Sequence, residues 1–331
     1  MSDLPPAAEP CTDFFGVPPG DACCTVTSFS PASITIPEKM IVDPVGKESN
    51  THPIIISLIQ HLPSKQYILF DLGISQNWRE YVPEDKLDWV EKTFEPEVEE
   101  DVEGILERLG VAKEKVKFIV ISHHHWDHCG SSSFSSFPLA QVIVGPSTLS
   151  QIVALSPPHY SRPSTSPKPL ELSWSNSHEI LTFKDSFDLF EDGSFLIVPT
   201  PGHTPGHVAA VIRTFFEEGE EEYVVLAGDC AHHPSCLSPP PRRDSSSTKT
   251  TRYRFSAWRE EGEEEEEGPP KHSMHEDYGE AEESLERLKA LEGRREFMVL
   301  LAHDFRRWEG FEKDERGTVE ISGWRKKGLK E

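Results

Sequence analysis

Membrane-spanning segments and an export signal are absent from the sequence. No apolar run approaches the ~18–20 residues that a transmembrane helix needs. Met1–Pro5 lacks the basic and apolar regions of a secretory signal. With 6 cysteines in 331 residues, including the adjacent pair Cys23 and Cys24, the chain offers no disulfide framework. These absences predict a cytoplasmic protein with free thiols and no membrane partner.

Basic charge is also scarce, since the formal net charge is -24. A nuclease would need a basic track for phosphates, so the charge excludes nucleic acid as a partner. Part of the acidity lies in Glu260–Glu267, inside a segment at about 239–271 that is rich in Pro, Ser and Glu. Such a segment buries too little apolar surface to fold, so we expect a disordered acidic insertion.

One catalytic domain, at residues 21–315, is expected to contain this insertion. Strand signals run from about residue 25 to residue 302 without a second self-contained pattern. Residues 1–20 are rich in Pro and Ala and are expected to form a flexible arm. Residues 316–331 are expected to form a C-terminal tail. The sequence identifies no protein partner.

The most informative motif is His123–His128, which reads His-His-His-Trp-Asp-His. It directly follows Val116–Ile121, an apolar and β-branched run that predicts a buried strand. The potential ligands therefore leave a strand end on a short loop. Imidazole and carboxylate together suit zinc, with iron and manganese as weaker alternatives. A cloning tag is a poor explanation, because the motif is internal and follows a strand.

Three further apolar runs end in a potential metal ligand. Phe195–Val198 leads to His203, Tyr223–Gly228 leads to Asp229, and Phe297–Ala302 leads to His303. A single histidine after a strand is usually a turn residue. Four such junctions in one chain instead predict one site along the rim of a sheet.

Together these motifs resemble the metallo-β-lactamase superfamily. The resemblance rests on His-x-His-x-Asp-His at 123–128, Thr-Pro-Gly-His-Thr-Pro-Gly-His at 200–207, Gly-Asp at 228–229 and Ala-His-Asp at 302–304. Asp71 matches an early Asp motif, and the resemblance spans roughly residues 25–310. Within the superfamily, the chain is most similar to the N-acyl homoserine lactone lactonase branch. The resemblance implies an α/β fold, the four-layer αββα sandwich, with a dinuclear site at one end.

The resemblance also implies the cofactor, which is two zinc ions per chain. The implied ligand set is His123, His125 and His203 for one ion, Asp127, His128 and His303 for the other, and Asp229 as the bridge. Two close divalent ions make a metal-bound hydroxide available near neutral pH and polarise the substrate carbonyl. No side-chain nucleophile is then needed.

Asp127 and His232 are the expected catalytic residues. Asp127 can carry a proton to the leaving oxygen or nitrogen. The lactonase branch usually has a tyrosine three residues after the bridging Asp, where it helps to bind the substrate carbonyl. His232 stands at that position here, and its imidazole can donate the same hydrogen bond. Cys129 and Cys230 are expected to be small buried residues rather than nucleophiles.

Other residues near the motifs receive supporting roles. His124 is expected to point away from the metals, and Asp71 to orient the first ligand loop. His207 is expected either to support a ligand or to make a structural hydrogen bond. The walls of the substrate pocket are expected from three irregular stretches: residues 25–45, 74–95 and 156–178.

Periodicity predicts the remaining elements. Helical spacing indicates helices at Glu97–Leu109, Pro146–Leu155 and Gly279–Leu291. Further strands are predicted at Ile54–Leu62, Gln66–Asp71 and Gln141–Gly145. Cys24–Pro37 is expected to form a hairpin at the sheet edge.

The expected activity is the opening of a small cyclic ester or cyclic amide by a dinuclear metal hydrolase of the lactonase or lactamase type. One alternative is a thioesterase of the hydroxyacylglutathione hydrolase type, which would need a basic, Tyr-containing grip on glutathione. A second is a mononuclear iron persulfide dioxygenase that uses only part of the ligand set. A non-catalytic binding protein is the third. The partner is thus a small-molecule lactone, lactam or thioester.

Overall fold

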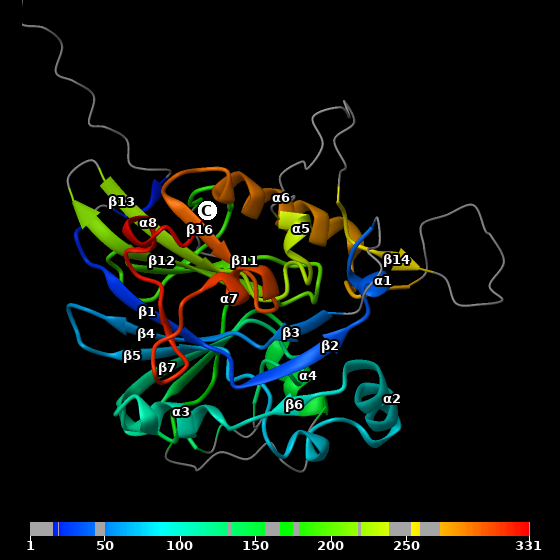
Figure 1. The fold of residues 1–331 in the computed structure, drawn as a ribbon. Coiled ribbons are helices and arrows are strands. Elements are labelled where there is room, and N and C mark those ends of the chain that lie inside the picture. The colour runs from blue at the N-terminus through cyan, green and yellow to red at the C-terminus, as the bar shows by residue number, and fades with distance from the viewer. Residues whose placement is uncertain are drawn as a thin grey trace, which may run out of the picture.

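Two β-sheets packed face to face form the centre of the molecule (Figure 1). The computed structural model describes residues 16–18, 20–43, 50–130, 134, 136–155, 166–174, 179–217, 220–237, 253–258 and 272–330. Within this part of the chain, no helix combines the length and the apolar character needed to cross a membrane.

The first sheet has seven strands. In spatial order they are β17 (Val319–Glu320), β1 (Cys24–Phe29), β4 (Ile56–His61), β5 (Tyr67–Phe70), β7 (Val116–Ile121), β8 (Gln141–Val144) and β9 (Leu170–Glu171). The strands from β17 to β5 pair antiparallel, whereas β5, β7, β8 and β9 run parallel to one another. The carboxyl ends of β5 and β7 therefore meet at the same edge, where the first histidine motif begins.

The second sheet has five strands. In spatial order they are β10 (Phe187–Asp188), β11 (Phe195–Pro199), β12 (Val208–Glu217), β13 (Glu220–Leu226) and β16 (Phe297–Leu300). β13 and β16 are parallel, and Leu226 lies opposite Leu300 at their carboxyl ends. The residues that follow these two strands are thus delivered to one place.

Helices cover the outer faces of both sheets, which gives four layers. On one side α3 (Val102–Arg108) and α4 (Thr148–Leu155) pack on the first sheet through residues such as Ile105 and Ile152. On the other side α6 (Tyr278–Glu292) packs on the second sheet through Leu285, Leu288 and Leu291. Figure 1 shows α6 above the two sheets and α3 below them. The fold is the αββα sandwich that the sequence predicts.

Smaller elements surround one end of the sandwich. They are a three-stranded sheet of β3 (Asn50–Pro53), β2 (Ala32–Ile36) and β6 (Glu97–Val98), a two-stranded sheet of β14 (Ala257–Trp258) and β15 (His272–Ser273), and the helices α1 (Glu38–Ile41), α2 (Glu84–Phe94), α5 (Pro234–Leu237), α7 (Phe305–Gly310) and α8 (Trp324–Lys327). Two 3₁₀ turns lie at Trp78–Glu80 and Lys113–Lys115.

Two predicted elements differ from the observed ones. Cys24–Pro37 is not a hairpin, because β1 joins the first sheet while β2 pairs with β3 and β6. The helix predicted at Glu97–Leu109 begins only at Val102. Before it, Glu97–Val98 pairs with β2 as a strand, which uses backbone groups that a helix would need for itself.

The described residues of two segments that were expected to lie outside the fold make contacts with it. In the C-terminal residues 316–331, β17 pairs with β1, and the buried Trp324 donates from Nε1 to the carbonyl of Tyr223 at 3.2 Å. In the N-terminal residues 1–20, Val17 is buried and Pro18 accepts a hydrogen bond from Arg213. Residues 1–15 and 19 lie outside the described residues.

The prediction of disorder for residues 239–271 is wrong at residues 253–258. Phe255 is only 2% exposed and belongs to the core. Asp43 and Arg254 pair through their backbones, and β14 pairs with β15. The rest of the predicted insertion, residues 239–252 and 259–271, lies outside the described residues.

Candidate metal centre

Seven side chains from four strand ends meet at one rim of the sandwich. The loop after β7 carries four of them, and the turns after β11, β13 and β16 carry one each: His123, His125, Asp127 and His128, then His203, Asp229 and His303. Every predicted ligand position lies in this cluster. The structure therefore brings together residues that are up to 180 positions apart in sequence, as the difference between 123 and 303 shows.

The cluster consists of two groups that share Asp229. One group is His123, His125, His203 and Asp229, and the other is Asp127, His128, Asp229 and His303. Within each group the candidate ligand atoms all lie within 4.8 Å of one another. Each group offers the nitrogen and oxygen donors that could hold one divalent cation.

Close packing at a glycine lets Asp229 reach the centre. Gly228 has a φ of +50°, and a Cβ there would lie 2.8 Å from His207 Nε2 and 2.9 Å from Ser122 Cβ. Only glycine fits such a conformation in so little space. The Gly-Asp pair after β13 is therefore required by the turn as well as by the carboxylate.

Fixed acceptors hold three of the imidazole rings with Nε2 facing the centre. His128 Nδ1 donates to Asp71 Oδ2 at 2.8 Å, and His303 Nδ1 donates to the carbonyl of Pro53 at 3.1 Å. Neither acceptor can donate, so each Nδ1 must carry the proton. Ser122 Oγ gives its own proton to Asp71, and it can thus only accept from His123 Nδ1, 3.0 Å away.

In the neutral form of each of these three rings the lone pair is then on Nε2 and points into the cluster, as a metal ligand requires. Asp71 thus orients the first ligand loop, as expected from the sequence. It accepts from the backbone of Ser122 at 2.7 Å as well as from His128.

His207 plays a supporting part and is not among the ligand groups. Its Nδ1 lies 2.7 Å from Thr200 Oγ1, and its Nε2 accepts from the backbone N–H of Asp229 at 3.0 Å. This structural hydrogen bond, one of the two roles expected for His207, fixes the turn that presents Asp229.

Two atoms at the centre test whether the residues fit a metal. His128 Nε2 and Asp229 Oδ1 are buried, 3.3 Å apart, and without a hydrogen-bond partner among the described residues. Leaving such atoms unsatisfied is costly. Beside them, His203 Nε2 lies 3.1 Å from His123 Nε2 and 2.9 Å from His125 Nδ1, so nitrogens converge on one point. A cation within each group would satisfy these atoms, and the residues therefore fit two metal ions.

Electrostatics sets the protonation of the two groups. Burial, followed by repulsion from neighbouring imidazoles, lowers the pKa of His123 and of His203 well below 6.5. Burial would also lower the pKa of His128, but the carboxylates of Asp229 and Asp127 outweigh it and raise that pKa well above 6.5. Burial would raise the pKa of Asp229, yet His303 and His128 hold it well below 3.8. Asp229 is therefore ionised, which is the form that binds a cation.

A cavity of about 440 Å³ opens onto this cluster. Its reactive end contains Asp127, Asp229 and His232. Apolar side chains dominate the rest of the cavity wall. They are Ile34 and Ile36 from β2, Val82 and Pro83 just before α2, Trp89, Val90 and Phe94 from α2, and Met274 after β15. Two of the three predicted wall stretches, residues 25–45 and 74–95, contribute. In the third, residues 156–165 and 175–178 lie outside the described residues.

His232 lies at the edge of the cluster, where sequence reasoning expected a substrate-binding residue. Its Nε2 is 3.1 Å from Asp229 Oδ2, and the residue lines the cavity. His124 also lines the cavity and is absent from both ligand groups, as predicted.

The thiols next to the ligands are poor nucleophiles. Cys129 and Cys230 are free and buried, and burial raises the pKa of each thiol well above 9.0. A thiol with such a pKa is not a thiolate at neutral pH. This agrees with the packing role expected for both residues.

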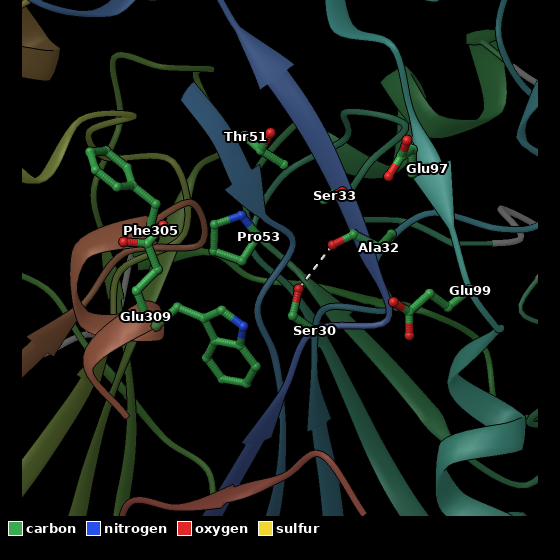
Figure 2. Close-up of a pocket in the computed structure, with 10 residues that line it drawn as sticks. Ser30, Ala32, Ser33, Thr51, Pro53, Glu97, Glu99, Phe305 and Glu309 are labelled. Carbon is green, nitrogen blue, oxygen red and sulfur yellow. Dashed lines mark hydrogen bonds between the residues drawn. The ribbon is translucent and has the colours of Figure 1, made fainter. Parts of the chain in front are cut away.

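A second cavity has a volume of about 290 Å³ (Figure 2). α7 borders it on one side, and β2, β3 and the segment around β6 on the other. It contains none of the seven clustered residues, although Pro53, which lines it, accepts the hydrogen bond of His303. The first cavity is therefore the candidate substrate site.

A model of the metallo-beta-lactamase superfamily matches residues 53–303. The chain belongs to this superfamily. Two curated relatives are a gamma-lactamase, MBL2, of Gibberella moniliformis and a gamma-lactamase, FDB1, of Fusarium pseudograminearum. The first is 31% identical over 174 residues, which are 50% of this chain and 71% of that protein. The second is 30% identical over 213 residues, 60% of this chain and 50% of that protein.

Solved metallo-beta-lactamase structures share the fold. A variant of AiiA from B. thuringiensis, with N-decanoyl-L-homoserine bound at its active site, matches with a TM-score of 0.59. It is 17% identical, and the match covers 88% of this chain and 97% of that one. AidC, a dizinc quorum-quenching lactonase, matches with a TM-score of 0.53 at 16% identity, over 92% and 97% of the two chains. Superfamily membership, the relatives and the ligand groups together support a metal-dependent hydrolase.

Sequence reasoning missed two buried histidines beside the metallo-beta-lactamase site. His52 lies 3.2 Å from the carbonyl of His303 through Nδ1, and burial lowers its pKa to about 3. The ring of His275 lies 5.3 Å from that of His203 and 5.3 Å from that of His232. Each is a single histidine without a motif around it, so no local pattern marks its place.

Proposed function

We propose that this protein is a dinuclear zinc hydrolase that opens a small cyclic ester or cyclic amide. The observation that carries the proposal is the pair of ligand groups that share Asp229 at the floor of an apolar cavity. Mixed imidazole and carboxylate ligands favour zinc. The dizinc character of AidC supports the same choice.

The ligand assignment follows the two groups. His123, His125 and His203 would hold one ion, Asp127, His128 and His303 the other, and Asp229 would bridge them. When bound, the two ions supply a Lewis acid for the substrate carbonyl and lower the pKa of water at the site. The rings of His128 and His303 are already fixed in the required tautomer by Asp71 and Pro53.

Asp127 is proposed to handle the proton. Hydrolysis forms a bond between the oxygen of water and the carbonyl carbon, and the ring C–O or C–N bond breaks. The leaving atom must then be protonated, above all when it is nitrogen. Asp127 lines the cavity, and its Oδ2 lies 3.5 Å from His303 Nε2. Its carboxylate is therefore at the metal end of the cavity, where the proposed substrate ring would be opened.

His232 is proposed to position the reacting groups. Its Nε2–H donates to Asp229 Oδ2 at 3.1 Å and so orients the bridging carboxylate. His232 also lines the cavity, where its imidazole is proposed to donate to the substrate carbonyl once the ring turns from Asp229. Such a donor stabilises negative charge as it develops on the carbonyl oxygen.

The character of the cavity favours a small ring over a glutathione thioester. Among the described residues that line it, Lys86 alone has a Lys or Arg side chain. Glutathione carries two carboxylates and would need more than one cationic partner. An uncharged lactone or lactam needs none, and apolar walls suit it.

A panel assay tests the proposal. The purified, zinc-loaded protein is incubated with γ-lactones, γ-lactams and acylglutathione thioesters, and the products are identified by mass. We expect ring opening with the mass of one added water, two zinc per chain, and no turnover by Asp229→Asn. Turnover of thioesters alone would replace the proposal by the thioesterase alternative. One iron per chain, with oxygen consumption on a persulfide, would replace it by the dioxygenase.

A further inference from the structure

One wall of the substrate cavity comes from outside the metal-binding motifs. Ser273, at the end of β15, lines the cavity together with Met274 and Glu276, which follow it. Met274 is half-buried and packs against the core that contains Ile34 and Ile36. These three residues follow the part of the chain that the sequence predicts to be disordered, so no sequence pattern places them at the site.

This wall is anchored on the side away from the metals. Phe255, which is buried in the core, packs on His275 with ring centroids 4.0 Å apart. The backbones of Asp43 and Arg254 exchange two hydrogen bonds of 3.0 Å. Tyr278 adds a hydrogen bond from its hydroxyl to the carbonyl of Phe255 at 3.3 Å. Figure 1 shows β14 beside α1, at the same end of the molecule as α2.

The wall is also anchored to a ligand loop. The backbone N–H of Glu276 donates to the carbonyl of His203 at 3.2 Å, and that of Asp277 donates to the carbonyl of Gly202 at 2.9 Å. Gly202 has a φ of +118°, and a Cβ there would lie 2.0 Å from the backbone nitrogen of Ala281. The wall and the loop that carries His203 are therefore joined through their backbones, which places Met274 beside that ligand loop.

We propose that Met274 determines how large an apolar substituent the substrate ring can carry. The inference rests on the proposed function, because the metal end of the cavity must hold the ring carbonyl for the substituent to face the apolar walls. The floor of the cavity holds the candidate ligands, and Val90 and Phe94 on the α2 side are buried core residues, whereas Met274 is only half-buried. Its thioether is therefore an adjustable boundary, since methionine is flexible and fills irregular space. The substrate class is then a lactone or lactam ring with a compact apolar substituent.

The expected effect is a change in selectivity. One methylene in an apolar pocket changes specificity by roughly 10-fold to 200-fold. Met274→Ala removes several heavy atoms and should raise the ratio of kcat/KM for long over short substituents by roughly 10-fold or more. Met274→Trp should lower the same ratio. Met274→Leu conserves volume and should leave it close to that of the wild type.

The test measures kcat/KM on a series of γ-lactones, and matched γ-lactams, with alkyl groups from methyl to octyl. Met40→Ala is the matched control, because Met40 is a buried methionine of the same core and does not line the cavity. A binding measurement accompanies it: Trp89 and Trp126 line the cavity, and their fluorescence reports the binding of the ring-opened products. Zinc content is measured for every variant and should not change.

The outcomes separate the two proposals. If the wild type opens none of the rings, the proposed function fails, and the fluorescence titrations still decide the role of Met274. A chain-length preference that is the same in Met274→Ala, Met274→Trp and the wild type, in turnover or in product binding, would overturn the inference. The same selectivity change in Met40→Ala would also overturn it, because the effect would then come from general loosening of the core.

Discussion

Asp71→Asn tests whether metal binding depends on the orientation of His128, because the variant keeps His128 but changes the group that orients it. The carboxylate of Asp71 accepts three hydrogen bonds, from the backbone and hydroxyl of Ser122 and from His128 Nδ1, at 2.7, 2.8 and 2.8 Å. Asparagine removes one acceptor and places an N–H₂ group against a donor. It adds no backbone strain, although φ is +61°, because asparagine tolerates the left-handed region.

The new amide is expected to reverse the tautomer of His128. If the amide donates to His128 Nδ1, the imidazole proton moves to Nε2, which then cannot bind a metal. To bind the metal through Nε2, His128 must carry its proton on Nδ1 again, and this breaks the new hydrogen bond from the amide. Loss of such a supporting carboxylate lowers metal affinity by roughly 10-fold to 100-fold, which corresponds to about 1.4–2.7 kcal/mol. Competition with a zinc chelator, followed by direct metal analysis, measures this change.

Asp192→Asn is the matched control. Asp192 Oδ2 also pairs with a histidine, His61, at 2.9 Å, but neither residue belongs to the ligand groups. The control should lower the free energy of unfolding in urea and leave zinc affinity unchanged. If Asp71→Asn binds zinc as tightly as the wild type does, the tautomer argument is refuted.

Three further changes have defined outcomes. Asp229→Asn should reduce zinc content and turnover together, and retained zinc would reject the bridging role. Burial and Arg306 lower the pKa of His233 from 6.5 to about 4 in the folded protein. As the pH falls between these two values, His233 is protonated in the unfolded chain but not in the folded one, so the free energy of unfolding decreases. His233→Asn should remove roughly 2 kcal/mol of the stability loss between about pH 7.5 and pH 5 in urea titrations. Trp324→Ala should cost roughly 3–5 kcal/mol of unfolding free energy, whereas a free tail would lose none.

The ends of four apolar runs predicted where candidate ligands would lie, and the resemblance to the metallo-β-lactamase superfamily implied the full set of seven. A run such as Val116–Ile121 identifies its own end, and parallel pairing of β5 with β7 and of β13 with β16 brings those ends to one rim. Residue type then decides the chemistry. The motifs can be recognised along the chain before the strand neighbours are known, and this explains why the site could be predicted in more detail than the strand pairing.

Which strands pair with one another was harder to predict from the sequence. β1 and β2 both alternate buried and half-buried residues, and only a bend at Ser30 and Pro31 separates them. Alternation reveals a half-buried strand but not its partner. β2 therefore looks like the second strand of a hairpin, although it pairs with β3 and β6 in a separate sheet.

Composition misled where order depends on one or two residues. The segment at about 239–271 is polar and acidic on average, so Phe255 carries no weight in a window of that length. In the structure Phe255 is buried and packs on His275. Trp324 likewise docks residues 316–330 because its side chain packs in the core between the sheets. A single aromatic side chain can bury enough apolar area to dock a short segment, and an average cannot show this.

The histidine rings of the candidate metal centre differ in the hydrogen bonds that hold their Nδ1 atoms. His128 and His303 are fixed by acceptors in or next to β-strands, namely Asp71 after β5 and the carbonyl of Pro53 in β3. His203 and His232 have buried Nδ1 atoms without a hydrogen-bond partner among the described residues. These two rings face His275 and the wall that carries Met274. The rigid half of the site thus belongs to the sheets, whereas the half held by the β14–β15 segment can change with the sequence of that segment without disturbing the fixed ligands.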